Sequence, residues 1–130
     1  MGIWVSEHPS MRDHRRLEVW LAAVGLARLV YSATEQLPDD ERFGVTAQMR
    51  RASFSVLSNI AEGAARHSQK DFARFLDVAA GSSGELMGQS EAVIELSLGP
   101  RALFEAVLEQ AERTKRMLHG LMKTVRSPTG

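Results

Sequence analysis

Hydrophobic residues recur every three or four positions in four separate segments, which is the spacing of one face of a helix. This period predicts helices over residues 13–36, 40–65, 69–97 and 101–125. The signals between them are Leu37-Pro38-Asp39 with Asp39 as N-cap of the second helix, a Ser-x-x-Asp pattern from Ser68, and Leu98-Gly99-Pro100. The sequence therefore predicts one all-α domain over residues 12–126, preceded by a disordered extension (1–11) and followed by a frayed tail (127–130).

The last three helices each show one clear apolar stripe. These stripes are Val45, Met49, Ala52, Val56, Ile60 and Gly63; then Phe72, Leu76, Ala79, Ser83, Leu86, Ser90 and Val93; then Phe104, Val107, Leu108, Ala111, Leu118, Leu121, Met122 and Val125. Residues 79–84 read Ala-Ala-Gly-Ser-Ser-Gly, which is typical either of a loop or of a helix that a neighbour approaches closely. The apolar phase continues through them, and this favours one unbroken helix.

Polar residues border these stripes on the second and third helices. The second helix carries Gln48, Arg51, Ser55, Asn59 and Glu62, and the third carries Ser82, Glu85 and Gln89. Such rows are either a solvated flank or a partly buried ladder of hydrogen bonds. The short turn between the two helices makes them antiparallel and brings Arg51 level with residues 82–85, so an Arg51–Glu85 ion pair is expected.

The first helix carries two apolar stripes instead of one. They are Leu17, Leu21, Val24 and Tyr31, and then Val19, Ala22, Ala23, Leu26, Leu29, Val30, Ala33 and Leu37. Two stripes predict a second buried face, which in so small a bundle indicates a subunit interface; the alternative is one wide core face. Trp20, Leu26 and Val30 are the candidate interface residues, although Trp20 equally suits the core.

Several motifs match a known family. They are Gln48-x-x-Arg51-Ala-Ser, Ser58-Asn-Ile-Ala-Glu-Gly63, Asp71-Phe72, Phe75-Leu76 and Gly81-Ser82-x-x-Glu85-Leu86, with Val19-Trp20 and Leu37-Pro38-x-x-Glu41-Arg42-Phe43 before them. The chain thereby resembles the bacterial four-helix-bundle proteins related to the 23S rRNA intervening-sequence protein. The resemblance implies an up-down-up-down antiparallel bundle, a homopentamer ring, and no enzymatic activity or cofactor. It extends, more distantly, to the accessory variability protein of diversity-generating retroelements, a basic protein that works with nucleic acid.

Composition narrows the function further. The 130 residues have no net charge, which argues against a globally basic nucleic-acid binder, and no Cys, which fits a reducing cytoplasm. No apolar run is long enough for a membrane span. His8, His14, His67 and His119 lack metal-binding spacing, and no nucleophile has a partnered base. We therefore expect no enzyme, metal, cofactor or small-molecule substrate.

Charge is nevertheless unevenly placed. Folding into a bundle would gather Arg12, Arg15, Arg16, Arg66, Lys70, Arg74, Lys123 and Arg126 at one end, and Glu35, Asp39, Asp40, Glu41, Glu91, Glu95 and Glu105 at the other. Helix dipoles explain only some of these positions, because several of the bases lie at helix N-termini. These bases need either acids of the same protein or an external anion. The first hypothesis is a self-assembling scaffold or adaptor; the alternative is an RNA- or DNA-binding module that uses the basic end.

Overall fold

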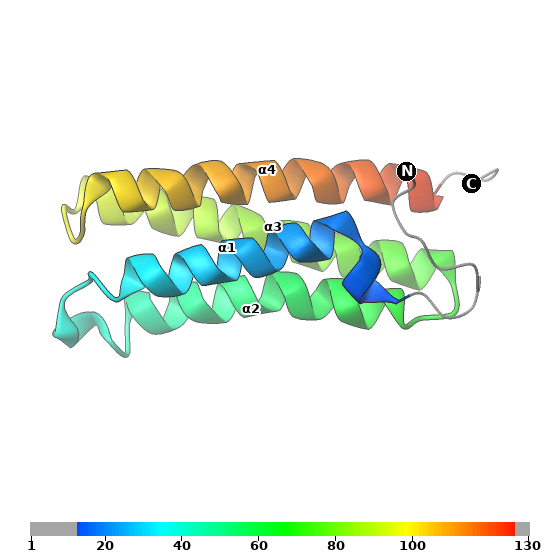
Figure 1. Cartoon of the computed structure of the whole chain (residues 1–130), viewed down its shortest axis with the longest axis horizontal. Helices are drawn as coiled ribbons and strands as arrows, with labels where there is room; N and C mark the ends of the chain where they lie inside the picture. The colour runs from blue at the N-terminus through cyan, green and yellow to red at the C-terminus, as the bar shows by residue number, and fades with distance from the viewer. Residues whose placement is uncertain (1–12, 127–130) are drawn as a thin grey trace.

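Four α-helices and two short 3₁₀ turns make up the computed structural model, which describes residues 13–126 (Figure 1). The elements are η1 (His14–Arg16), α1 (Glu18–Thr34), η2 (Asp39–Glu41), α2 (Val45–Ala64), α3 (Gln69–Glu95) and α4 (Arg101–Arg126). Residues 13–126 contain no strand, so the all-α prediction is confirmed. The extension predicted for residues 1–11, the tail predicted for residues 127–130, and Arg12 lie outside the described residues.

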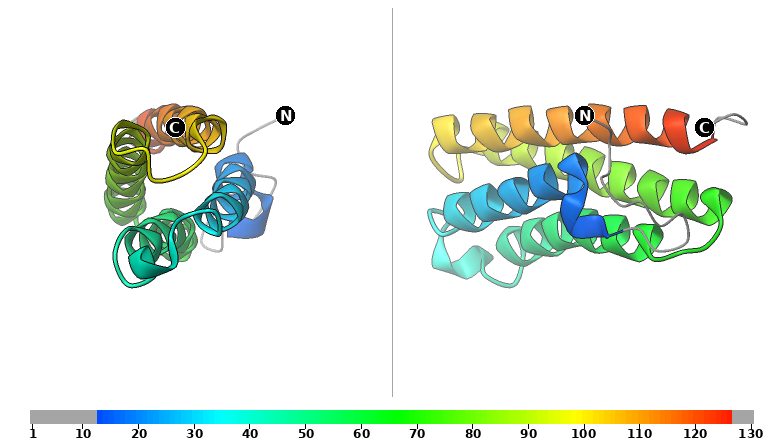
Figure 2. Two further views of the ribbon diagram at one scale, coloured as in Figure 1. Left: turned by 90° about the vertical axis from the view of Figure 1, so that its left-hand side faces the viewer. Right: turned by 45° about the vertical axis from the view of Figure 1, so that its right-hand side comes forward.

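The helices lie side by side, and consecutive helices run in opposite directions, as the colour order in Figure 1 shows. The end view in Figure 2 shows them around a shared interior in the order α1, α2, α3, α4. Each helix packs on the next along the chain, and α4 returns to pack on α1. This arrangement brings the beginnings of α1 and α3 to the same end as the last turns of α2 and α4.

The core is built from the stripes that the sequence predicts. All seven residues of the α3 stripe are buried, from Phe72 to Val93. In the α2 stripe only Val45 is partly exposed, and in the α4 stripe only Leu108. Burying each large apolar side chain contributes roughly 1.5–3 kcal/mol. Packing of these faces therefore holds the bundle together.

Two helices begin later than the sequence predicts. The Asp13 carboxylate accepts a hydrogen bond from the Arg15 backbone N–H and forms η1, and extended Leu17 then delays α1 to Glu18. Gly44 is non-helical (φ −106°, ψ −111°) and separates η2 from α2. The prediction of Asp39 as N-cap of the second helix is therefore wrong. The N-cap residue of α2 is Gly44, so this helix has no side-chain cap.

Helix α3 begins and ends with clear capping interactions. The Ser68 hydroxyl accepts a hydrogen bond from the Asp71 backbone N–H at 3.0 Å, which confirms the capping pattern. The helix then runs through Gly81 and Gly84 without a break, as the apolar phase predicts. After its last turn Ser97 adopts a positive φ of 54°. The Leu98 N–H then donates to the carbonyl of Val93 at 3.1 Å.

Gly63 lies where α2 approaches the start of α3. A Cβ added there would stand 2.8 Å from the Phe75 Cβ, 3.0 Å from the Phe72 Cδ1 and 3.3 Å from the Phe72 carbonyl oxygen. Ordinary carbon–carbon contacts are about 3.5–4.0 Å. The two helices can pack this closely because residue 63 has no side chain.

Several hydroxyl groups are buried inside the core. Ser53 donates to the carbonyl of Arg50 at 2.8 Å, Ser83 to that of Ala79 at 3.2 Å, and Thr114 to that of Gln110 at 2.9 Å. Each of these partners lies one turn earlier in the same helix. These three hydroxyls are thus satisfied within their own helices, whereas the buried Thr34 hydroxyl also accepts a hydrogen bond from Arg50 of α2.

Candidate functional site

The basic end is the set of eight basic residues predicted at one end of the bundle. It comprises Arg12, Arg15, Arg16, Arg66, Lys70, Arg74, Lys123 and Arg126. Arg12 lies outside the described residues, and only the backbone of Arg16 is described. The other six come from η1, the turn after α2, the start of α3 and the end of α4, which meet at the right of Figure 1. Their partners decide whether this end is free to bind an anion.

Arg15 is held by Asp13 in a two-point ion pair. Its Nε lies 2.9 Å from Oδ1 of Asp13, and its Nη2 lies 3.0 Å from Oδ2. These hydrogen bonds lower the pKa of the Asp13 carboxyl below its ordinary value of 3.8 and raise the pKa of the Arg15 guanidinium. The chain itself supplies the anion for this arginine.

Arg66 and Arg74 both stack on the ring of Phe75. Their guanidinium carbons lie 4.8 Å and 4.6 Å from the ring centroid. Arg66 also pairs with Glu62 at 2.7 Å, and Arg74 pairs with Asp71 at 3.7 Å. The sequence leaves two explanations open for these bases, acids of the same protein or an external anion. For Arg66 and Arg74 the partners are acids of the same protein.

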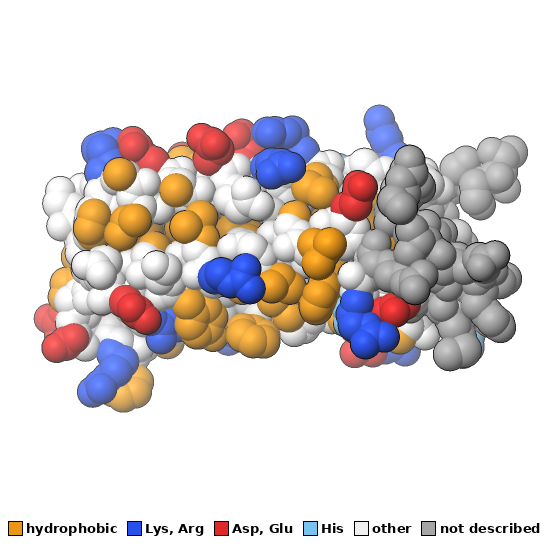
Figure 3. All heavy atoms as spheres, viewed as in Figure 1, with side chains coloured by type: hydrophobic (Ala, Val, Ile, Leu, Met, Phe, Trp, Pro, Cys, Tyr) orange, Lys and Arg blue, Asp and Glu red, His pale blue; other side chains and the backbone are white. Residues whose placement is uncertain are grey.

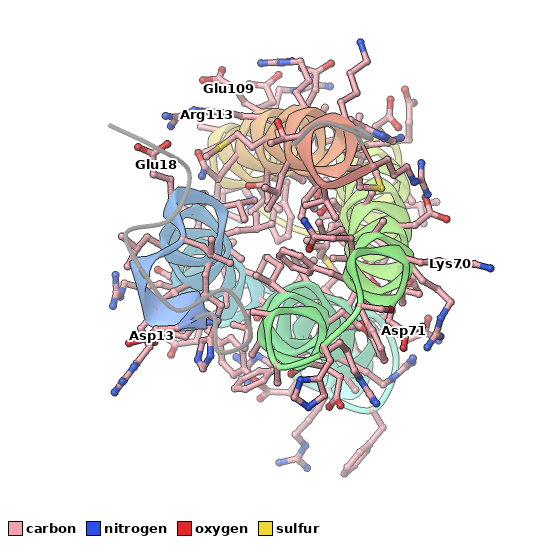
Figure 4. All side chains as sticks on the ribbon, turned by 90° about the vertical axis from the view of Figure 1, so that its right-hand side faces the viewer. Asp13, Glu18, Lys70, Asp71, Glu109 and Arg113 are labelled. Atoms are coloured by element: carbon pink, nitrogen blue, oxygen red, sulfur yellow. The ribbon has the colours of Figure 1, made fainter. Side chains whose placement is uncertain are left out.

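Lys70, Lys123 and Arg126 are the described bases at this end that belong to no ion pair among residues 13–126. All three are exposed. Figure 4 shows Lys70 extending outward from α3. Lys123 and Arg126 line an open cleft of about 420 Å³ together with His119 and Met122. Among the described residues, these three therefore carry the positive charge at the basic end that is available to an external anion.

The middle of the polar ladder is partly buried and hydrogen-bonded. The hydroxyl oxygens of Ser55 on α2 and Ser82 on α3 lie 2.8 Å apart. The Asn59 amide donates to the Ser55 carbonyl at 2.8 Å and to its hydroxyl at 3.1 Å. Here the ladder links the two helices.

The outer members of the ladder are instead solvated. Gln48, Arg51, Glu62 and Glu85 are exposed. The predicted Arg51–Glu85 pair is wrong, because no ion pair within residues 13–126 joins these two side chains. Glu85 instead accepts a hydrogen bond at 3.3 Å from the amide of Gln89, which lies one turn further along α3. The solvated-flank alternative therefore holds for Gln48, Arg51, Glu62 and Glu85, whereas Gln89 is partly buried.

The model of the 23S rRNA-intervening sequence protein family matches residues 15–120, most of the chain. The chain belongs to this family. None of the curated proteins compared with it matches. The matched range includes the segment from Ser58 to Gly63 and the segment from Gly81 to Leu86. In this member of the intervening-sequence protein family, the first segment contains Gly63, where α2 approaches α3 closely. The second contains Ser82, whose hydroxyl forms a hydrogen bond with that of Ser55.

The candidate subunit interface needs a correction. Leu26 and Val30 are 0% exposed and lie in the core of the single bundle, so they offer no surface to a second subunit. Their stripe faces the interior because it is the one that meets α2 and α4. Trp20 is partly buried against that core, with its ring 5.1 Å from the ring of His14.

The other α1 stripe is divided: Leu17 is buried in the core and Val24 is partly buried, whereas Leu21 and Tyr31 lie at the surface. We define the apolar strip as Leu21, Tyr31 and Phe54, which are 58%, 36% and 52% exposed. The rings of Tyr31 and Phe54 meet edge to face at 6.2 Å, and Arg50 stacks over Tyr31 at 4.6 Å. Figure 3 shows hydrophobic side chains gathered over α1 and α2 on this side. The α1 stripe that begins at Leu17 includes Leu21 and Tyr31, but the periodicity of α2 gave no reason to choose Phe54.

Neither a metal-binding cluster nor a membrane-spanning helix is found in the described part of the chain. Within residues 13–126 no three His, Asp or Glu side chains come together as metal ligands would. Over the same range no helix is both long and apolar enough to cross a bilayer.

Proposed function

We propose that the chain is a non-enzymatic scaffold or adaptor that assembles with copies of itself. The proposed assembly is a homopentamer ring of up-down-up-down four-helix bundles in the cytoplasm. The ring and its size follow from the resemblance to the intervening-sequence family, and the cytoplasm fits a chain without Cys.

One observation carries the proposal: the apolar strip on α1 and α2. Leu21 and Phe54 are more than half exposed although their helices already have complete inner faces. Exposed aromatic residues beside arginine are the composition that is enriched at the centres of protein interfaces. Covering these side chains would add roughly 25 cal/mol for each Å² of apolar surface removed from water. A second protein surface is the natural cover.

The mass of the full chain in solution tests the proposal. We would measure it by native mass spectrometry and by light scattering at micromolar concentration. Five copies of the 14.4 kDa chain give about 72 kDa. A mass of 14.4 kDa would overturn self-assembly. Another multiple of this mass would overturn the ring of five while retaining self-assembly.

A pair of matched variants tests the role of the strip. Leu21→Asp with Phe54→Asp places charge on the apolar strip and is expected to reduce the mass to that of one chain. Ala102→Asp with Ala106→Asp places the same two charges on exposed positions of α4 and should leave the assembly intact. Helicity measured by circular dichroism should stay unchanged in both. Assembly of the strip variant at the wild-type mass would exclude the strip as the contact.

A second candidate function is nucleic-acid binding by the basic end, which is favoured by the unpaired Lys70, Lys123 and Arg126. We would titrate the chain into a fluorescent structured RNA and a matched duplex DNA and follow anisotropy at low and near-physiological salt. Phosphate contacts make log affinity fall linearly with log salt. Reversing these three residues to Glu should abolish binding, whereas Arg15→Glu, at a residue already paired with Asp13, should change it less. Equal affinity of the triple variant would refute this function.

A further inference from the structure

The arginines around the apolar strip have no carboxylate partner among residues 13–126. Arg28 and Arg51 are exposed and belong to no ion pair. Arg50 donates to the Thr34 hydroxyl at 2.9 Å and stacks on Tyr31, so its charge is also uncompensated. The strip is therefore an apolar surface with three arginines around it, and one exposed acid, Glu35, follows Tyr31 by one turn.

The outer face of α3 has the opposite character. From residue 75 to residue 96 the sequence has no Lys or Arg, but it carries Asp77, Glu85, Glu91 and Glu95, all of them exposed. None of these acids belongs to an ion pair within residues 13–126. Acids that form no ion pair within the bundle can gain electrostatic stabilisation from a positive partner.

The shape of this α3 face is also suited to an aromatic partner. Val78 is 46% exposed on it. At Gly81 and Gly88 an added Cβ would meet nothing within 4 Å, so the helix backbone lies open to solvent there. We define the α3 outer face as Asp77, Val78, Gly81, Glu85 and Gly88. A protruding ring could approach this backbone closely.

We infer that the apolar strip of one copy docks on the α3 outer face of a second copy. The inference rests on the proposed self-assembly and names its two surfaces. Arg28, Arg50 and Arg51 would face Asp77 and Glu85, while Tyr31 and Phe54 would cover Val78 and the glycines. The alternative contacts are disfavoured by charge. Strip against strip would bring six arginines together, and α3 against α3 would bring the acids together.

The two surfaces lie on different helices, so the contact is heterologous. One copy uses its strip, the next uses its α3 outer face, and the pattern continues until a rotation closes it. A symmetric two-fold dimer would instead use the same patch on both copies. This difference can be measured by mixing variants.

The experiment uses two variants of the full chain and native mass spectrometry. The strip variant is Leu21→Asp with Phe54→Asp, and the face variant is Gly81→Arg with Gly88→Arg, which the open space at both glycines accommodates. Each variant alone is expected at the mass of one chain. Their equimolar mixture should associate, with a mass of at least two chains, because one strip and one face remain intact. Gly120→Arg, on an exposed α4 position with equally open space, should assemble as the wild type does.

The outcomes separate the two hypotheses. A wild-type chain that stays at the mass of one copy overturns the proposed self-assembly and this inference with it. A wild-type assembly that the face variant reproduces overturns the inference alone. A mixture that stays at single-chain mass also overturns it, because the intact strip of the face variant would then have failed to dock on the intact α3 outer face of the strip variant.

Discussion

Replacing Gly63 by Ala tests whether α2 and α3 need a residue without a side chain where they meet. The new Cβ would lie 2.8 Å from the Phe75 Cβ and 3.3 Å from the Phe72 carbonyl oxygen. Neither atom can rotate away, because one is a β-carbon and the other belongs to the backbone. The helices would have to separate locally by several tenths of an ångström.

Two opposing contributions set the size of the effect. Overpacking by one methyl group in a well-packed core costs about 1–3 kcal/mol. Alanine in place of glycine inside a helix regains about 1 kcal/mol. Since the clashing atoms are not the ends of flexible side chains, we expect the upper part of the first range. The Gly63→Ala variant should thus lose about 1–2 kcal/mol of unfolding free energy, with a melting temperature lower by roughly 2–8 °C per kcal/mol.

Gly120→Ala provides the matched control. A Cβ at position 120 would meet nothing within 4 Å, so this variant should gain up to about 1 kcal/mol from helix propensity alone. We would compare both variants with the wild type by urea unfolding followed at 222 nm, at one protein concentration because assembly shifts apparent stability. A Gly63→Ala chain as stable as the Gly120→Ala chain would falsify the close-contact explanation.

Three further changes have defined outcomes. Ser68→Ala removes the N-cap of α3 and should lower the unfolding free energy measured in urea by about 0.5–2 kcal/mol. Ser68→Asp keeps a side-chain acceptor at the N-cap and should retain most of the wild-type stability; equal losses would contradict the capping role. The pKa of Asp13 should lie below 3.8 in an NMR titration and return toward that value in Arg15→Gln. Because this folded-state pKa is lowered, the stabilisation is complete above the unfolded pKa and is lost as pH falls through the folded one; an unmoved pKa would argue against the ion pair. Single and double alanine variants of Ser55 and Ser82 should show a coupling of about 0.5–1.5 kcal/mol in a double-mutant cycle, and additive losses would mean that the two hydroxyls do not interact.

Apolar periodicity predicted the interior of the bundle well, because burial follows directly from helical phase. The α3 stripe from Phe72 to Val93 is buried throughout, and the helix continues through Gly81 and Gly84. Packing decides such positions, and the pattern of apolar residues records the packing.

Surface features were less predictable, because phase gives the face of a helix but not the conformation of a side chain. Arg51 and Glu85 lie at the predicted level of the ladder, yet both side chains extend into water, where an ion pair gains little. At the basic end, local pairs such as Asp13–Arg15 depend on backbone turns that periodicity does not describe. The two stripes of α1 were visible in the sequence, but which one faces inward depends on the positions of α2 and α4.

The buried hydroxyls have a consequence for how the helices find their alignment. Ser53, Ser83 and Thr114 each bond a carbonyl of their own helix, so they would keep that bond if the helix slid or rotated against its neighbours. These hydrogen bonds therefore do not determine the register between helices. Alignment along the bundle is therefore specified by shape, as at Gly63, and by a bond between helices such as Ser55–Ser82. In a redesigned core, these three hydroxyl residues could be replaced by alanine, and the helices should still align in the same register.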